Sequence, residues 1–441
     1  MSGFLFALFL CLAGGYTAYR LKFFCLLHPA ACLRYLLARE DDGRATGYSP
    51  MRALCVALAG TLGVGNITGV AAAILLGGPG ALFWMWVSSL CTVLIKYAEV
   101  YLAVGTRFAR KDGGRYTYHG GPMRYLALLP GGRMWAYLFC VLCVFASFLQ
   151  GNLMQVNAAV CCIQRTTRIS PVVLSLLMAV LAAALVFGGR GRIAGFCAAM
   201  IPTMTALYLV MGLTVILRNL PLLPTVFSEI FAEAFSLQAF GGGGIGMLMA
   251  MRHGCAKGVF THEAGCGTAP ISHAGAETAF PARQGIFGIA EVIVDTPVLC
   301  TVTGLALLIS GVGYAGGGDC HTAVLDAFGL WFGNAARYFL SVSIVFYAFA
   351  ALVCWSFYGT ECLSHILSGY SDHVRRCGMR VYLTAYCLCT LCGAYVSQDF
   401  LWRASDVITM VMTTINTVGV VILLKQVKVP PLRAKESQRN I

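Results

Sequence analysis

Repeated apolar segments of about twenty residues constrain this chain more than any other feature of its sequence. Of the 441 residues, 59% are hydrophobic and only 11% are charged. A soluble protein of this size needs more charge to cover its surface, whereas about 20 consecutive apolar residues span the hydrocarbon core of a bilayer. The sequence therefore predicts an all-α polytopic membrane protein surrounded by the lipid bilayer.

Each apolar segment is expected to form one membrane span, which gives eleven spans. They cover residues 3–25, 51–76, 79–108, 134–163, 170–188, 194–217, 236–254, 283–311, 333–368, 379–396 and 403–426. With the N-terminus outside and the C-terminus inside, 25 of the 31 Lys and Arg residues fall on the inner side and five on the outer side. Because cytoplasmic loops are enriched in Lys and Arg, this bias predicts the orientation. It also explains the net charge of +13 without a nucleic-acid partner.

The second span contains residues that weaken a helix at mid-depth. Residues 58–70 read LAGTLGVGNITGV within the uncharged segment Ala53–Leu76, and each glycine in a helix interior costs roughly 1 kcal/mol. The seventh span carries a similar interruption, AFGGGGIGM, over Ala239–Met247. The ten spans after the first divide into two sets of five with opposite topology, and each set begins with an interrupted span. This arrangement is typical of inverted repeats in secondary transporters, whose substrate sites lie near the bilayer midplane.

The repeat predicts how the chain is organised. We expect an N-terminal transmembrane helix and inner loop over 1–50, a first five-helix repeat over 51–220, a second inverted repeat over 221–428 and a cytoplasmic tail over 429–441. Unwound backbone is tolerated in a membrane only where it lines a polar site. Its N–H groups can bind a carboxylate and its carbonyl groups a small cation, so an amino acid carried with a cation satisfies both. The alternative is close helix packing through small residues, which explains Asn66 and four consecutive glycines less well.

Six motifs in order resemble the alanine or glycine:cation symporter family. They are GNITGVAAAILLGGPGALFWMW (Gly65–Trp86), KYAEVYLAV (Lys96–Val104), GGPM (Gly120–Met123), GVFTHEAGCGTAPISHA (Gly258–Ala274), RQGIFG (Arg283–Gly288) and WSFYG (Trp355–Gly359). The resemblance implies a LeuT-like fold of two inverted five-helix repeats plus one additional N-terminal transmembrane helix. It implies a symporter rather than an enzyme, carrying a small neutral amino acid such as alanine or glycine by alternating access. The driving ion is Na+, or H+ in some members, and the location is the cytoplasmic (inner) membrane.

The resemblance also implies a substrate site. Gly63–Asn66, GVGN, is similar to the Gly-x-Gly-Asn motif of the neurotransmitter:sodium symporters. By that similarity the N–H groups of Val64 and Gly65 contact the substrate carboxylate, and Asn66 offers its side-chain oxygen to the substrate or an ion. The glycine run of the seventh span and a tryptophan in the ninth complete this side of the site, which adds Gly241, Gly242, Gly243 and Trp355.

Two amide side chains lie in the fourth span. Asn152 and Gln155 are three residues apart, so they are expected to share one helix face. Polar side chains within a span need partners. A substrate pocket and a structural interhelical hydrogen bond are both consistent with this pair.

The expected cation ligands are the carbonyl groups of Ala59 and Leu62 together with Asn66 and Ser356. The family commonly has Thr at position 64 and Ser-Thr at 350–351, where this chain has Val and Ala-Ala. A hard cation requires several oxygen ligands. The loss of three hydroxyl groups therefore leaves two alternatives open: an H+-coupled symporter, or a degenerate transporter-fold binding protein without Na+ coupling.

Coupling to H+ requires a titratable group within a span. Asp295 and Glu291 are four residues apart in the eighth span, so they lie on one helix face. Carboxylates inside a membrane are costly and usually functional, which makes both candidate proton sites. The alternative is a salt bridge near the inner membrane boundary.

No other class of function has a comparable signature. The chain has no phosphate-binding loop, no HExxH motif and no symmetric pore loop. Its 20 cysteines lie mostly in apolar segments, where thiols act as small apolar residues, and the spacing in Thr261–Ala274 fits no standard zinc pattern. We therefore expect no cofactor and no metal other than the co-transported cation, and we expect the protein to function as a monomer.

Overall fold

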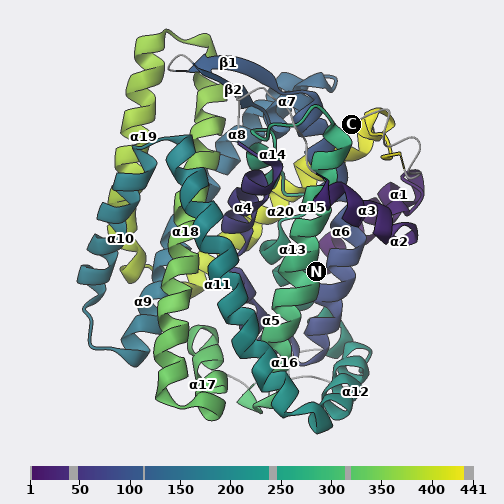
Figure 1. The fold of residues 1–441 in the computed structure, drawn as a ribbon, viewed down its shortest axis with the longest axis vertical. Helices are drawn as coiled ribbons and strands as arrows, with labels where there is room; N and C mark the ends of the chain where they lie inside the picture. The colour runs from purple at the N-terminus through teal and green to yellow at the C-terminus, as the bar shows by residue number, and fades with distance from the viewer. Residues whose placement is uncertain (1, 39–47, 113–114, 238–245, 313–318, 432–441) are drawn as a thin grey trace.

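The computed structural model describes residues 2–38, 48–112, 115–237, 246–312 and 319–431. In this part of the chain, helices form one bundle that a single β-hairpin caps at one end (Figure 1). The elements of the first half are α1 (Ser2–Arg20), α2 (Phe24–Leu27), α3 (Pro29–Leu37), α4 (Pro50–Thr61), η1 (Val64–Asn66), α5 (Thr68–Gly77), α6 (Gly80–Gly105), β1 (Phe108–Asp112), β2 (Arg115–His119), α7 (Pro122–Tyr125), η2 (Leu126–Leu128), α8 (Gly132–Phe148), η3 (Leu149–Leu153), α9 (Met154–Thr166), α10 (Pro171–Val186) and α11 (Arg190–Arg218). The second half contains η4 (Leu220–Leu222), α12 (Leu223–Ala234), α13 (Gly246–His262), α14 (Ala269–His273), α15 (Pro281–Ile293), η5 (Val294–Cys300), α16 (Thr301–Ile309), α17 (Cys320–Phe332), α18 (Asn334–Ile366), η7 (Leu367–Gly369), α19 (Asp372–Cys392), η8 (Gly393–Tyr395), α20 (Gln398–Leu423) and η9 (Leu424–Gln426).

The described residues include seven helical segments that are long and apolar enough to cross a membrane. These are Gly80–Gly105, Gly132–Thr166, Arg190–Arg218, Pro281–Ile309, Cys320–Gly369, Asp372–Tyr395 and Gln398–Gln426. Shorter apolar helices cover Phe4–Arg20, Pro50–Thr61, Thr68–Gly77 and Pro171–Val186. Apart from residues 236–254, each expected span coincides with one of these segments or with a pair of short helices.

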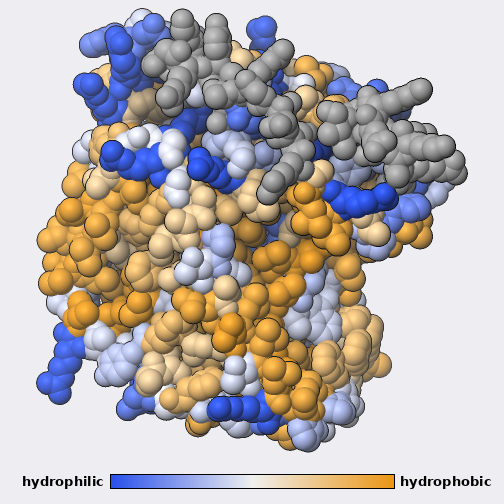
Figure 2. Space-filling model, in the orientation of Figure 1, coloured by the Kyte–Doolittle hydropathy of each residue, from blue (hydrophilic) through white to orange (hydrophobic). Residues whose placement is uncertain are grey.

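The surface of the bundle has the polarity of a membrane protein. Figure 2 shows a broad hydrophobic band across the middle of the molecule and hydrophilic residues towards both ends. On α10 and α11, Val173, Val180 and Val210 expose about 60% of their surface. Exposed apolar surface this extensive is not stable in water, so we assign this band to the lipid.

The first helix interruption is confirmed. The helical hydrogen bonds of α4 end where the N–H of Leu62 donates to Leu58 O at 2.6 Å. A single 3-10 turn, η1, follows, and α5 resumes at Thr68. The glycines and Asn66 therefore divide this span into two half-helices, as the local sequence predicts.

The second interruption lies elsewhere than expected. The span predicted over 236–254 is wrong, because the helix of this region, α13, runs from Gly246 to His262. The chain unwinds over residues 263–268, and α14 begins at Ala269. Gly265 (φ 82°) and Gly267 (φ 88°) make this turn in the left-handed region that favours glycine. The run Gly241–Gly243 lies outside the described residues.

This shift moves two charges to the other end of the bundle. Arg252 and Lys257 were counted among the inner charges, at and just beyond the end of the span expected over 236–254, but both lie within α13. They line a cavity together with Asp319, which precedes α17. We call this end of the molecule the α17 end and the opposite end, which carries β1 and β2, the hairpin end (Figure 1).

Two π-helical segments flank the core. They are η3 between α8 and α9, and η5 between α15 and α16. Pro297 lies within η5, where the missing N–H and the bulk of the ring disturb α-helical bonding. Segments of this kind often occur at functional sites, and both of these place polar side chains in the bundle interior.

The hairpin is an element that the sequence did not predict. Its strands pair antiparallel, with Phe108 opposite His119. Next to it, Arg107 donates hydrogen bonds to the carbonyl groups of Ala274 (3.1 Å), Ala276 and Thr278. This arginine therefore ties the end of α6 to the chain that follows α14.

Candidate functional site

The 3-10 turn η1, which separates α4 from α5, packs directly on α13. A Cβ atom placed on Gly65 would lie 3.2 Å from Phe260 and 3.4 Å from Thr261. Val64 and Asn66 are buried at this contact. A larger residue at position 65 would require Phe260 to shift by a few tenths of an ångström, so η1 and the last turn of α13 are in close contact and enclose one interior region.

Asn66 and Asp295 meet in this region although 229 residues separate them. The Nδ2 group of Asn66 donates to Asp295 Oδ1 at 2.7 Å and lies 3.3 Å from the carbonyl oxygen of Asp295. Asp295 is fully buried. The other side-chain atom of Asn66, Oδ1, is buried and has no hydrogen-bond partner among the described residues. The amide nitrogen of Asn66 and the carboxylate of Asp295 are thus held together in the core, and the amide oxygen is left without a partner among the described residues.

Two threonine hydroxyl groups extend this cluster. Thr296 donates to Asp295 Oδ2 at 2.8 Å, and its oxygen lies 3.3 Å from the hydroxyl oxygen of Thr261 on α13. The cluster therefore combines oxygen atoms from η1, α13 and η5. Carboxylate, amide and hydroxyl oxygens are the ligands that hard cations prefer, so this oxygen cluster is a candidate cation site.

Gln155 closes the other side of the interruption. Its Oε1 atom accepts a hydrogen bond from the N–H of Val64 at 3.1 Å. Its Nε2 group donates to Gln150 O at 3.1 Å, and Thr409 of α20 donates to Gln150 Oε1 at 2.8 Å. A Cβ atom at Gly63 would come within 2.7 Å of Gln155 Oε1. The N–H group expected to bind a substrate carboxylate is therefore bound to a side-chain carbonyl of η3–α9.

Asn152 does not share a face with Gln155. Its Nδ2 group donates to Tyr386 O of α19 at 2.7 Å, so it faces away from η1. The expectation of a common face is wrong because η3 is π-helical and changes the angular spacing along the helix. Trp355 packs on η3, since a Cβ atom at Gly151 would overlap the Trp355 side chain.

The residues expected to form a carbonyl-based cation site are all buried. Ala59 and Leu62 are at the end of α4, and Ala351 lies beside the interruption, where a Cβ atom at Gly63 would come within 3.2 Å of it. The hydroxyl group of Ser356 donates to Val353 O at 2.6 Å in its own helix. A cation role for these residues stays a prediction.

Glu291 belongs to a second buried cluster. Lys96 Nζ lies 3.2 Å from Glu291 Oε1 and 3.7 Å from Glu99 Oε1, and all three side chains are completely buried. His273 Nε2 lies 3.1 Å from Glu291 Oε2, and Gln284 donates to His273 Nδ1 at 2.7 Å. The salt bridge considered for Glu291 is thus present, whereas Asp295 points to Asn66. A proton role for either carboxylate stays a prediction.

The same charged cluster holds the second interruption in place. Glu99 accepts hydrogen bonds from the N–H of Gly265 at 3.3 Å and from Asn416 at 2.7 Å, and Asn416 also donates to Gly265 O at 2.8 Å. The unwound segment between α13 and α14 is therefore bound to α6 and α20. Residues 257–274 are buried throughout, so this segment is part of the core.

A cavity of about 770 Å³ leads from the α17 end towards the interruption of the first helix pair. In its wall, Lys257 Nζ lies 2.9 Å from Asp406 Oδ1 and 4.0 Å from the ring centre of Trp402. The Trp402 ring lies 5.2 Å from the ring of Phe260, which contacts Gly65. The cavity also reaches Thr409, the hydrogen-bond partner of Gln150. One face of the molecule thus gives access to the residues around η1.

Several of these residues were missed from the sequence. They are Gln150, Thr261, Thr296, Thr303 and Thr409. Thr303 donates to Asn66 O at 2.9 Å and shares a hydrogen bond with Tyr208. Threonines inside apolar spans were the available signal, but threonine also bonds to the carbonyl groups of its own helix, so their positions alone do not identify a site.

Replacing Gln155 tests its contact with the interrupted helix. Gln155→Ala removes the acceptor of the Val64 N–H and leaves this buried donor unpaired, which costs about 1–3 kcal/mol. We expect a lower melting temperature in detergent and an altered substrate affinity. Gln155→Glu keeps the acceptor but buries a charge and loses the donor to Gln150 O, so its melting temperature should fall as well. Asn157→Ala, two residues further on α9 and hydrogen-bonded to Gly393 O and Val396 O, is the control for stability loss without a change in substrate affinity. Equal substrate affinities in all three variants would contradict the placement of Gln155 at the substrate site.

Interrupted helices that meet in the core of a membrane-length bundle, with a cavity reaching them from one face, define a secondary transporter. Comparisons with known proteins identify its family. The model of the sodium:alanine symporter family matches residues 1–438, and the chain belongs to this family. The family resemblance expected from the motifs is thereby confirmed.

Individual relatives agree with this assignment. The chain is 34% identical to an uncharacterized transporter of Haemophilus influenzae over 93% of this chain and 89% of the relative. It is 32% identical to the sodium/alanine symporter AgcS of Methanococcus maripaludis, with the same coverage of the two chains. Its fold is also similar to that of a Na+-coupled sialic acid symporter solved in a substrate-bound outward-open state, with a TM-score of 0.59 and 12% identity over 94% of this chain and 86% of that chain.

Proposed function

We propose that this protein is a symporter that carries a small neutral amino acid, alanine or glycine, together with Na+ across the cytoplasmic membrane. The observation that carries this proposal is the contact between Asn66, at the interruption of the first helix pair, and the buried carboxylate of Asp295. The family of the chain and its similarity to the sodium/alanine symporter AgcS support the same substrate and ion.

The oxygen cluster is the Na+ site in this proposal. A buried carboxylate is costly unless its charge is balanced, and a cation that displaces the Asn66 amide nitrogen from Asp295 balances it. The same cation gives the unpartnered Oδ1 atom of Asn66 a ligand role. This site supplies ligands that Ala350 and Ala351 of α18 lack, so Na+ coupling does not depend on the three missing hydroxyl groups. A second cation at Ala59, Leu62, Asn66 and Ser356 remains part of the proposal.

The substrate binds next to this ion. In our proposal the substrate carboxylate replaces Gln155 Oε1 as the acceptor for the N–H of Val64, and Gln155 turns to the substrate. Gly65 and the residues preceding α13, Gly241, Gly242 and Gly243, contribute further backbone groups. Ala351 lies beside Gly63, and Trp355 lies about one turn further along α18. We propose that both residues leave room only for a small substrate side chain.

Alternating access follows from the architecture that we propose. Eleven spans are formed by the seven long segments, α1, the pair α4 and α5, α10, and the pair α13 and α14. They are arranged as a LeuT-like fold with repeats over 51–220 and 221–428 after an N-terminal helix in 1–50 and before the tail 429–441. The N-terminus is outside and the C-terminus inside, and the protein acts as a monomer. Placing Arg252 and Lys257 on the outer side leaves the bias of Lys and Arg towards the inner side in place. The cavity at the α17 end then faces outwards.

Uptake into proteoliposomes tests the function. Labelled alanine and glycine are offered under an imposed Na+ gradient or an imposed H+ gradient, each with a K+ gradient as the control. Uptake driven by Na+ alone is the expected result. Uptake driven only by H+ would move the coupling to Asp295 or Glu291 as proton carriers. Saturable binding without gradient-driven uptake would indicate a degenerate binding protein.

A further inference from the structure

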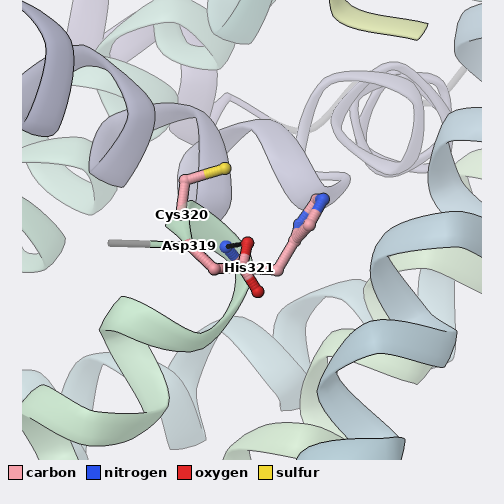
Figure 3. Close-up of side chains that lie close together, drawn as sticks. All are labelled: Asp319, Cys320 and His321. Atoms are coloured by element: carbon pink, nitrogen blue, oxygen red, sulfur yellow. Dashed lines mark hydrogen bonds between the residues drawn. The ribbon is translucent and has the colours of Figure 1, made fainter. Parts of the chain in front are cut away.

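Three metal-binding side chains lie together at the start of α17, outside the proposed transport site. They belong to Asp319, Cys320 and His321, which fan out from the first turn of the helix (Figure 3). An oxygen of Asp319, the sulfur of Cys320 and a ring nitrogen of His321 all lie within 4.8 Å of one another. Cysteine, histidine and aspartate are the residue types that bind Zn²⁺ in proteins.

Helix capping explains only one of the three residues. Asp319 is the N-cap of α17, and its Oδ1 accepts a hydrogen bond from the N–H of His321 at 3.0 Å. This role makes no use of the Cys320 thiol or of the His321 ring. An apolar residue at position 321 would continue the helix equally well, so capping does not account for the cluster.

The His321 ring points to a ligand. The residue is 1% exposed, and both of its ring nitrogens are buried without a hydrogen-bond partner among the described residues. A buried polar group that stays unpaired costs about 1–3 kcal/mol. Native proteins pair nearly all such groups, so a bare imidazole beside a thiol and a carboxylate is the arrangement expected of a metal site seen without its ion.

The cluster is accessible and has an outer-shell partner. Asp319 is exposed, and both Asp319 and Cys320 line the cavity of about 770 Å³ at the α17 end. Gln398 of α20 donates from Nε2 to the sulfur of Cys320 at 2.9 Å. Hydrogen bonds of this kind orient metal ligands and stabilise their charge. An ion can therefore enter from the cavity and bind the Cys320 sulfur, which Gln398 already orients.

We propose that Asp319, Cys320 and His321 form a binding site for a thiophilic divalent cation such as Zn²⁺. Zn²⁺ binds sulfur at about 2.3 Å and nitrogen or oxygen at about 2.0–2.2 Å. Tetrahedral ligand atoms then lie roughly 3.5 Å apart, so the three side chains reach an ion with small changes in rotamer. Three protein ligands leave the fourth position to water from the cavity. The site is separate from the Na+ site, and it does not depend on the proposed function.

Co²⁺ titration of the purified full-length protein tests this proposal. Co²⁺ reports a thiolate ligand by a sulfur-to-metal charge-transfer absorption, and Zn²⁺ should displace it. We expect one Co²⁺ per chain with this absorption. Cys320→Ser should abolish the absorption, and His321→Gln should weaken binding at least tenfold. Gln398→Ala should weaken it about tenfold, as for other outer-shell partners. Cys377→Ser, which removes an exposed thiol on α19, should change nothing.

A second measurement covers variants that fold poorly. In the wild-type protein, Zn²⁺ should protect Cys320 from alkylation by maleimide, as read by mass spectrometry of the peptide that contains it. This protection should be lost in His321→Gln, whose Cys320 remains present. A charge-transfer absorption that persists in Cys320→Ser, or alkylation of Cys320 that Zn²⁺ does not slow, would overturn the proposal.

Discussion

Replacing Asp295 with asparagine is expected to reduce Na+-driven amino-acid uptake about 100-fold at limiting Na+. The carboxylate is completely buried and holds Asn66 at 2.7 Å and Thr296 at 2.8 Å. Asparagine keeps the size and one acceptor oxygen but removes the negative charge that balances the cation. Losing a charged partner in a buried site costs up to about 3 kcal/mol, and 1.4 kcal/mol corresponds to about tenfold in affinity.

The measurement is the Na+ concentration that gives half-maximal alanine uptake in proteoliposomes. Asp372→Asn is the matched control, because this aspartate on α19 is 74% exposed and pairs only with Arg375 among the described residues. Asn66→Ala should abolish substrate binding, because it removes the amide from the ion and breaks the contact between η1 and Asp295. An unchanged half-maximal Na+ concentration in Asp295→Asn would remove the oxygen cluster as the Na+ site.

Replacing Lys96 with methionine is expected to lower stability by about 3–5 kcal/mol. Lys96 is the cation of the second buried cluster and faces both Glu291 and Glu99. Breaking a buried ion pair by removing one partner leaves an uncompensated charge, which accounts for a cost of this size. Since Glu99 also holds Gly265, the loss extends to the unwound segment between α13 and α14. The readout is the melting temperature of the protein in detergent.

A double variant separates charge compensation from side-chain packing. Lys96→Met combined with Glu291→Gln removes two opposite charges, so it should recover part of the stability that Lys96→Met loses. Lys425→Met, at an exposed position after α20, should leave the melting temperature unchanged. If the double variant is no more stable than Lys96→Met alone, charge balance does not explain the role of Lys96.

The first interruption was predictable because its cause is local. Glycines and Asn66 follow one another within a short stretch, and the backbone of η1 unwinds there. The interruption that the structure shows in the second half of the chain was not predicted, because the expectation rested on Gly241–Gly243, which lie outside the described residues. Glu263–Thr268 unwinds because Gly265 and Gly267 adopt left-handed conformations and because Glu99 and Asn416 bind the turn. Those contacts come from α6 and α20, so nothing in the local sequence reveals them.

The pairing of site residues depended on tertiary contacts as well. Asn66 and Asp295 were each identified from their own span, as a motif residue and as an intramembrane acid. Their contact joins residues 229 positions apart, which no spacing predicts. Helical spacing also failed for Asn152 and Gln155, because the π-helical η3 changes the direction of the side chains. Spacing between Glu291 and Asp295 likewise gave no sign that Lys96 binds one of them and Asn66 the other.

The central claim is that one buried site binds an amino acid and Na+ together. The most direct test is the dissociation constant of alanine for the purified protein, measured at increasing Na+ with choline as the replacement cation. Because coupling between two ligands is reciprocal, we predict that alanine binds more tightly as Na+ rises and that Asp295→Asn loses this dependence while the Asp372→Asn control keeps it. An alanine affinity that is the same in Na+ and in choline would contradict the account.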